Sequence, residues 1–106
     1  MTGIESIAAE RKRQVEAEGW SPEHDDENDA GEMAAAGAAY ALNAACILYP
    51  YDGVGLEGLP DSWPAQWDPA FWKPRTPRED LVRAGALIAA EIDRLDRAAA
   101  QTDLKS

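Results

Sequence analysis

Residues 30–48 read AGEMAAAGAAYALNAACIL, and no charged side chain follows Glu32 in this stretch. Alanine is the best helix former, and a helix that is apolar on all sides must be buried on several of them. Small side chains also allow neighbouring helices to approach closely. We therefore expect residues 30–48 to form the central helix of an all-α domain.

A first helix is expected before it, over about residues 3–18. Thr2 and Glu5 have the spacing of a capping box, in which each side chain accepts from the other residue's backbone. Apolar residues then recur at helical spacing, and Gly19 is placed to end the helix.

A third helix is expected over about residues 77–100, with residues 101–106 frayed. Thr76 and Glu79 form a second capping-box pattern, and Pro77 takes the first helical position. Two acid-before-base pairs, Glu79 with Arg83 and Asp93 with Arg97, have the i, i+4 spacing that supports a helix.

The connection between the second and third helices is rich in proline and tryptophan. Residues 49–77 hold six of the seven prolines and three of the four tryptophans, which excludes a helix or a central strand. We expect an ordered loop over 49–76 that covers an open face of the helices with its aromatic residues, which are Tyr49, Tyr51, Trp63, Trp67, Phe71 and Trp72.

Length and charge narrow the class of protein. A chain of 106 residues forms a single domain, 1–106, with three main helices. Twenty acidic residues against ten basic ones give a net charge of −10, which argues against direct nucleic-acid binding. The single Cys46 permits no internal disulfide, and no signal peptide or membrane span is recognisable, so a cytoplasmic location without membrane contact is expected.

The alanine-rich helix also predicts a partner. Two amphipathic helices hide only part of a helix that is apolar all round, so the tryptophan-rich loop or another subunit must cover the rest. We expect a homodimer.

Acidic residues are concentrated in residues 16–32, which contain eight acids and no Lys or Arg. Hard cations such as Mg²⁺ prefer several carboxylate oxygens, although a charge run is also typical of a solvated loop. Asp29 and Glu32, at i and i+3, either share a cation or cap the start of the helix. His24 is a metal ligand, a general base or a solvated imidazole, and Trp20 is a lid on the core or a stacking platform.

Several short motifs together resemble one known family, the phage-encoded MazG-like proteins of the all-α nucleoside triphosphate pyrophosphatase superfamily. The resemblance spans about 70 residues and excludes the tryptophan-rich loop. It rests on residues 9–14 (AERKRQ), Gly19-Trp20, His24-Asp25-Asp26, residues 31–34 (GEMA) opening an alanine-rich helix, and the last helix from Arg78 to Arg97.

The resemblance implies a helical fold and a magnesium site. In the family, one acidic pair on the second helix and one on the third bind Mg²⁺, which coordinates the triphosphate. Asp29 and Glu32 match the first pair, and Asp80 matches one member of the second. Arg83 stands where the remaining acid is expected, which implies weaker metal binding or a phosphate contact.

The leading hypothesis is therefore a dimeric MazG-like nucleotide-binding protein. If it is an enzyme, it is a Mg²⁺-dependent nucleoside triphosphate pyrophosphohydrolase, with Asp29, Glu32 and Asp80 as metal ligands. Arg78 and Arg83 would face phosphates, and Trp20 would contact the nucleotide. The candidates for the catalytic base are Glu23, His24, Asp25 and Asp26.

The alternative belongs to a different class. A non-catalytic acidic phage accessory or counter-defence protein, acting in the host cytoplasm, would sequester a nucleotide or occupy the basic surface of a host protein. The net charge of −10 favours this hypothesis, because the dense acids of residues 16–32 can imitate nucleic-acid charge.

Overall fold

The fold is all-α, as the sequence predicts. The computed structural model describes residues 1–49 and 55–105, and no strand occurs in these ranges. The elements in chain order are α1 (Gly3–Glu18), α2 (Pro22–Asp26), α3 (Glu32–Leu48), the short 3-10 helix η1 (Pro69–Phe71) and α4 (Pro77–Lys105). The three main helices and the long connection between the last two confirm the predicted architecture. Tyr51 and Gly53 of that connection lie outside the described residues.

Helix α1 has the predicted ends because both of its caps are local. Thr2 Oγ1 accepts from Glu5 N at 3.1 Å, and Glu5 Oε1 accepts from Thr2 N at 2.9 Å. Gly19 closes the helix in the left-handed region at φ 73°, where a glycine carries no Cβ penalty.

Helix α2 is missing from the sequence prediction, which gave no helix between the first one, ending near residue 18, and the one beginning at residue 30. Its single turn is too short to show periodicity, but it has clear local signals. Ser21 Oγ accepts from His24 N at 3.2 Å, and Pro22 occupies the first helical position.

Helix α3 begins two residues later than predicted, and Asp29 is not its N-cap. Gly31 is the cap residue, with φ 85°. Glu32 is the first helical residue, and its Oε1 accepts from Ala30 N at 2.6 Å. The carboxylate of Glu32 thus satisfies a backbone donor just before the helix.

Helix α4 begins at Pro77 as predicted but continues to Lys105 instead of ending near residue 100. Residues 96–105 contain no Gly or Pro that would stop it. The two arginines do not pair with the acids predicted for them, four residues earlier in the helix. Arg83 contacts Tyr40 instead, and Arg97 pairs with Asp26.

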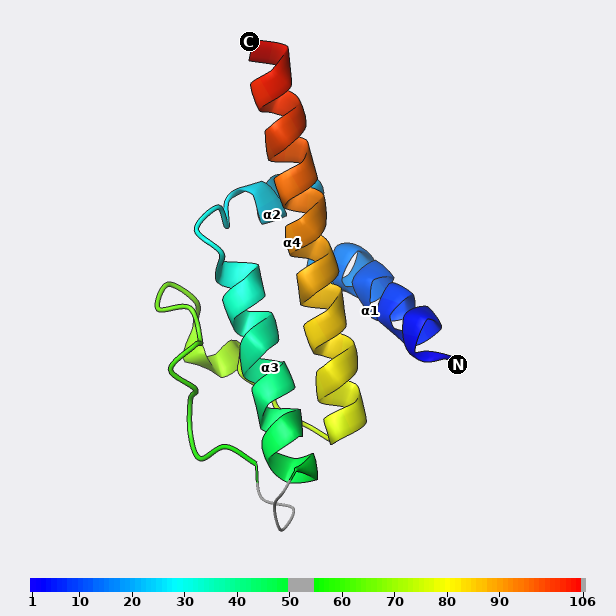
Figure 1. Cartoon of the computed structure of the whole chain (residues 1–106), viewed down its shortest axis with the longest axis vertical. Coiled ribbons are helices and arrows are strands. Elements are labelled where there is room, and N and C mark those ends of the chain that lie inside the picture. Colours follow the sequence, from blue (N-terminus) through cyan, green and yellow to red (C-terminus); the bar gives the residue numbers. More distant parts are fainter. Residues whose placement is uncertain (50–54, 106) are drawn as a thin grey trace.

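The helix at the centre of the fold is α4, not α3. Helix α4 contacts α1, α2 and α3, whereas α3 packs against α4 and the aromatic connection (Figure 1). Helices α3 and α4 run antiparallel, because Asn43 near the end of α3 bonds Asp80 near the start of α4. The prediction of a central α3 was wrong because the long connection, and not a further helix, covers one side of α3 that α4 leaves open.

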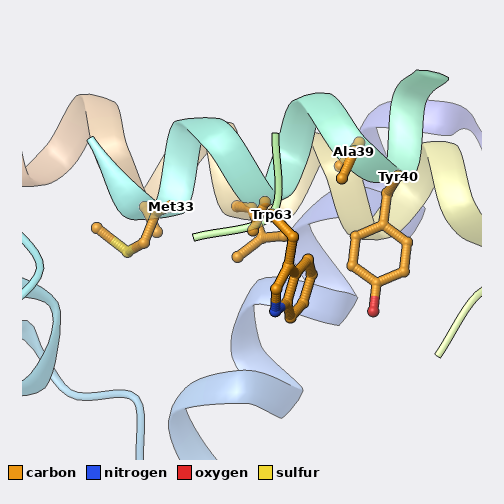
Figure 2. Close-up of a cluster of buried hydrophobic side chains, with 8 residues drawn as sticks. Met33, Ala39, Tyr40 and Trp63 are labelled. Atoms are coloured by element: carbon orange, nitrogen blue, oxygen red, sulfur yellow. The ribbon is translucent and has the colours of Figure 1, made fainter. Parts of the chain in front are cut away.

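The core lies between α3, α4 and the connection. Its buried apolar residues are Met33, Ala36, Ala39, Tyr40, Trp63, Ala84, Leu87 and Ala90. Figure 2 shows the ring of Trp63, from the connection, and that of Tyr40, from α3, on the same side of α3. Trp63 is 7% exposed, while Trp67 and Trp72 are partly buried against it. The connection therefore covers one face of the helix pair, as expected.

Candidate functional site

A cavity of about 380 Å³ opens between α1, the core and the aromatic connection. Its volume lies in the range typical of small-molecule sites. We call it the aromatic cavity. Its walls are formed by Arg13, Gln14, Glu18, Trp20, Tyr40, Trp63, Trp67, Phe71, Lys73, Arg75, Arg83 and Leu87.

The charge of the aromatic cavity is opposite to that of the chain. Four of the ten basic residues line it, against one of the twenty acidic residues. Five aromatic side chains share the same walls. A positive, aromatic hollow in an acidic protein fits a ligand that is both anionic and planar.

The hydroxyl of Tyr40 joins three parts of the cavity wall. It donates to Phe71 O at 3.0 Å and accepts from Lys73 N at 3.1 Å and from Arg83 Nη1 at 3.2 Å. The Arg83 guanidinium also lies 5.2 Å from the centroid of the Tyr40 ring. This buried side chain therefore fixes the position of Arg83 and of the backbone that carries Lys73.

Arg13 is held at the cavity by two carboxylates. Its Nε and Nη2 donate to Glu10 at 2.7 and 2.8 Å, and its Nη1 donates to Glu18 at 2.9 Å. The hydrogen bonds from Arg13 lower the pKa of the Glu10 carboxyl, despite partial burial, and the same contact raises the pKa of Arg13. Glu10 also lies 3.9 Å from Arg83 Nε, so it stands between two of the cavity's arginines.

Two buried polar atoms belong to residues of the cavity wall. Gln14 Oε1 is an acceptor and Trp63 Nε1 is a donor, and neither has a hydrogen-bond partner among the described residues. Gln14 is 1% exposed and Trp63 is 7% exposed. Buried polar atoms are nearly always paired in native proteins, so these two are exceptions, and each is too deeply buried to meet a ligand in the cavity without a side-chain movement.

The four predicted base candidates lie on α2 and not in the cavity wall. Asp25 is fully buried, accepts from Arg11 Nη2 at 2.6 Å and lies 3.1 Å from His24 Nδ1. Asp26 pairs with Arg97 at 2.8 Å, and Glu23 is exposed. Asp25 therefore holds α2 against α1 through Arg11, and Asp26 holds α2 against α4 through Arg97.

The connection from α2 to the cavity runs through Trp20. The rings of Trp20 and His24 are stacked with centroids 5.5 Å apart and an interplanar angle of 9°. Trp20 itself lines the cavity and meets Trp67 edge-on at 6.1 Å. The ring of Trp20 thus lies between His24 and the cavity.

The three predicted metal ligands are not brought together. Asp80 is 2% exposed and accepts from Asn43 Nδ2 at 2.9 Å and from Arg75 N at 2.8 Å. Asn43 is eleven residues along α3 from Glu32, which corresponds to roughly 16 Å of helical rise. Asp80 therefore lies at the opposite end of the α3–α4 pair from Glu32, while Asp29 precedes α3 and is exposed.

In the part of the chain that the structure describes, no group of three or more His, Cys, Asp or Glu side chains is arranged to hold a metal ion. Both oxygens of Asp80 already accept hydrogen bonds from the protein. The residues predicted to bind Mg²⁺ do not fit a shared site in this arrangement.

Of the residues predicted to contact a nucleotide, the structure places Trp20 and Arg83 in the aromatic cavity. Arg78 lies outside it, beside Glu10, Glu79 and Val82, and donates to Ser6 Oγ at 2.8 Å.

Sequence reasoning missed Arg13, Lys73 and Arg75, which also line the cavity. One signal was available for two of them. Lys73 and Arg75 are the only basic residues in 49–76, and they directly follow Phe71-Trp72. Interleaved aromatic and basic residues are typical of sites for anionic aromatic ligands.

Comparison with protein-family models, curated proteins and solved structures found no match to this chain. Among the described helices, none combines the length and the apolar character needed to cross a bilayer.

Proposed function

We propose that the protein binds a nucleotide in the aromatic cavity. The observation that carries this proposal is the gathering of four cations and five aromatic rings around one hollow in a chain of net charge −10. A nucleotide offers both a planar base and a polyanionic phosphate chain. A cytoplasmic location, expected from the sequence, agrees with such a ligand.

The aromatic rings supply the contact for the base. Trp63 meets Trp67 edge-on at 5.7 Å and Tyr40 edge-on at 6.1 Å, so these rings are not stacked face to face on one another. Stacking of a base on an aromatic side chain contributes about 1–3 kcal/mol and tolerates any base.

The cations supply the contact for the phosphates. Arg83 is fixed by Tyr40, and Lys73 and Arg75 extend from the backbone that Tyr40 and Asp80 bind. An arginine held in one orientation can donate two parallel hydrogen bonds to a phosphate, and lysine adds a compact charge. The Arg83 side chain and the backbone at Lys73 and Arg75 are positioned before the ligand arrives, so only the exposed Lys73 and Arg75 side chains need ordering on binding.

Hydrolysis of the bound nucleotide is the prediction of the family resemblance and stays a separate proposal. Asp29, Glu32 and Asp80 do not converge, so we derive no magnesium-dependent step from this arrangement. Sequestration without turnover needs only the aromatic cavity. A role against a host protein's basic surface would have to use exposed acids such as Glu23 and Asp29, because Asp25 and Asp26 are paired internally.

The homodimer predicted from the apolar helix also belongs to this proposal. Large apolar side chains of α3 and α4 remain exposed in one chain, among them Leu42, Ile88 and Ile92. A second subunit would remove them from water.

Tryptophan fluorescence tests the nucleotide proposal directly, because Trp20, Trp63 and Trp67 line the cavity. Titration with ATP, dATP and AMP, each with and without Mg²⁺, should give a saturable change. Lys73→Gln is the sharpest variant, since Lys73 contacts Tyr40 only through its backbone N–H in the described structure. We expect Lys73→Gln to weaken ATP binding about 10-fold or more, as the loss of one charge-assisted contact of at least about 1.4 kcal/mol implies.

Lys12→Gln is the matched control, because the Lys12 side chain is 74% exposed on α1 and pairs only loosely with Glu16, at 3.9 Å. It should bind ATP like the wild type. No saturable change with any nucleotide up to millimolar concentration, or equal weakening by both variants, would contradict a nucleotide site in this cavity. Pyrophosphate release, measured in the same samples, separates turnover from retention.

A further inference from the structure

Helices α3 and α4 each carry an exposed apolar stripe. On α3 the exposed residues Ala34, Ala38, Ala45 and Leu48 follow the spacing of one helix face, with Leu42 at its edge, while Ala41 on the same face is partly buried against the core. On α4 it comprises Leu81, Ile88, Ile92 and Leu95, which are each 45–53% exposed; Gly85, on the same helix face between Leu81 and Ile88, lies under the Ile7 side chain of α1. No charged residue belongs to either stripe.

The two stripes border one another. A Cβ built on Gly37, which lies between Ala34 and Ala41 on the helix surface, would stand 3.3 Å from Ile88 Cγ1. The helices therefore meet closely at this point, and the small stripe of α3 continues into the large stripe of α4. Together they form one face, which we call the apolar face.

The apolar face lies across the α3–α4 pair from the aromatic cavity. Tyr40 and Leu87 line the cavity, and both are buried. Ala38 is about 160° from Tyr40 around α3, and Ile88 is about 100° from Leu87 around α4, at 100° per residue. A partner on the apolar face would thus leave the cavity open.

The size of the apolar face favours a permanent cover. Six leucine or isoleucine side chains on this face are each 45–62% exposed, and three exposed alanines, Ala34, Ala38 and Ala45, lie beside them. Exposed apolar residues scattered singly are normal on a monomer, whereas a contiguous group like this one marks an interaction site.

We propose that the apolar face is the interface between two copies of this chain, packed as a four-helix bundle. A two-fold axis running along the helices, between the two layers, sets α4 of each copy on α3 of the other in antiparallel orientation. Leucine and isoleucine side chains of α4 then fall on the alanines of α3, and this alternation of large and small residues fills space well.

The chemistry of the face distinguishes a second copy from other occupants. The stripes carry no cation that would contact an anionic lipid headgroup, and the chain's net charge of −10 opposes such a surface. The large residues on the α4 half of the face match the small residues on the α3 half. The face is therefore complementary to the same face of a second copy. This inference rests on the proposed homodimer and is independent of the nucleotide proposal.

Introducing a charge on α3 tests the interface. Ala38 is exposed in the single chain, so Ala38→Glu should leave the helical circular dichroism and the fold of the monomer intact. In the bundle the same substitution buries two carboxylates without partners, and the dimer dissociation constant should rise about 100-fold or more. Ala17→Glu, at an exposed alanine of α1, is the matched control and should not change it.

Sedimentation velocity at protein concentrations from about 1 to 200 μM measures the fractions of monomer and dimer. A wild-type dimer that Ala38→Glu converts to a folded monomer, with Ala17→Glu unchanged, supports the interface. A wild type that stays monomeric throughout overturns the homodimer itself. A dimer that survives Ala38→Glu overturns this interface while leaving the homodimer in place, and the fluorescence titration with ATP is unaffected by any of these results.

Discussion

Removing the hydroxyl of Tyr40 isolates the contact that organises the aromatic cavity. In Tyr40→Phe the ring, which is 2% exposed, keeps its packing against Trp63 and Trp72. The variant loses only the three hydrogen bonds to Phe71 O, Lys73 N and Arg83 Nη1. Any change therefore reports on the polar contacts and not on a cavity in the core.

The size of the effect follows from the number and exposure of the partners. Each neutral hydrogen bond contributes a net 0.5–1.5 kcal/mol and one to a charged group about 1.5–3 kcal/mol. Phe71 and Lys73 are exposed, so water can replace part of the loss. We expect the free energy of unfolding to fall by about 2 kcal/mol, which lowers the Tm by roughly 8–16 °C for a domain of this size.

Urea unfolding followed by tryptophan fluorescence measures this change, and the ATP titration on the same variant measures its effect on the cavity. Because Arg83 and the backbone at Lys73 lose their anchor, ATP affinity should fall together with stability. Tyr49→Phe is the control, since Tyr49 is 78% exposed, and it should match the wild type. A loss below about 0.5 kcal/mol in Tyr40→Phe would show that water replaces all three bonds and that the hydroxyl does not hold the connection in place.

Three further results are expected. Asp80→Asn should lower the free energy of unfolding by about 1–3 kcal/mol in urea, with or without Mg²⁺, because an amide cannot accept from both Asn43 Nδ2 and Arg75 N; unchanged stability would remove its structural role. Trp63→Ala should cost about 3–5 kcal/mol by the same assay, and a smaller loss would mean that the connection contributes little to the core. Since the pKa of Glu10 is lowered from 4.5 in the folded state, its contribution is present above that pH and is lost as the pH falls through the folded value. Thermal melts from pH 7 to 3 should therefore fall less steeply for Glu10→Gln, and parallel curves would refute this.

The parts of the fold that were predictable are those fixed by neighbours in sequence. The ends of α1 follow from Thr2, Glu5 and Gly19, whose partners lie within five residues. The end of α4 was misjudged because residues 96–105 contain no Gly or Pro that would stop the helix, and the alanines at 98–100 favour its continuation. Helix α2 was not predicted because a single turn is too short to show the helical spacing of apolar residues, although Ser21 and Pro22 are typical of a helix start.

The candidate site was predictable only in part, since its walls come from segments far apart in the chain. Trp20 and Arg83 were predicted to contact a nucleotide, and both line the cavity, while the contact itself stays a prediction. Asp80 was predicted to be a metal ligand, and its structural role was missed. Its main partner, Asn43, stands 37 residues away and gives no local signal in the sequence. No pattern within α1 indicates that Arg13 faces the same hollow as Lys73.

Trp63 belongs to two structures at once, the hydrophobic core and the wall of the aromatic cavity. Under the proposed function, substitutions there must satisfy stability and ligand recognition together, which leaves very few acceptable alternatives. Phe71, Lys73 and Arg75 are exposed and lie outside the core cluster, so they can vary at little cost to folding. Over evolutionary time, ligand preference in proteins built like this one should therefore drift through the rim of the cavity while its floor stays constant.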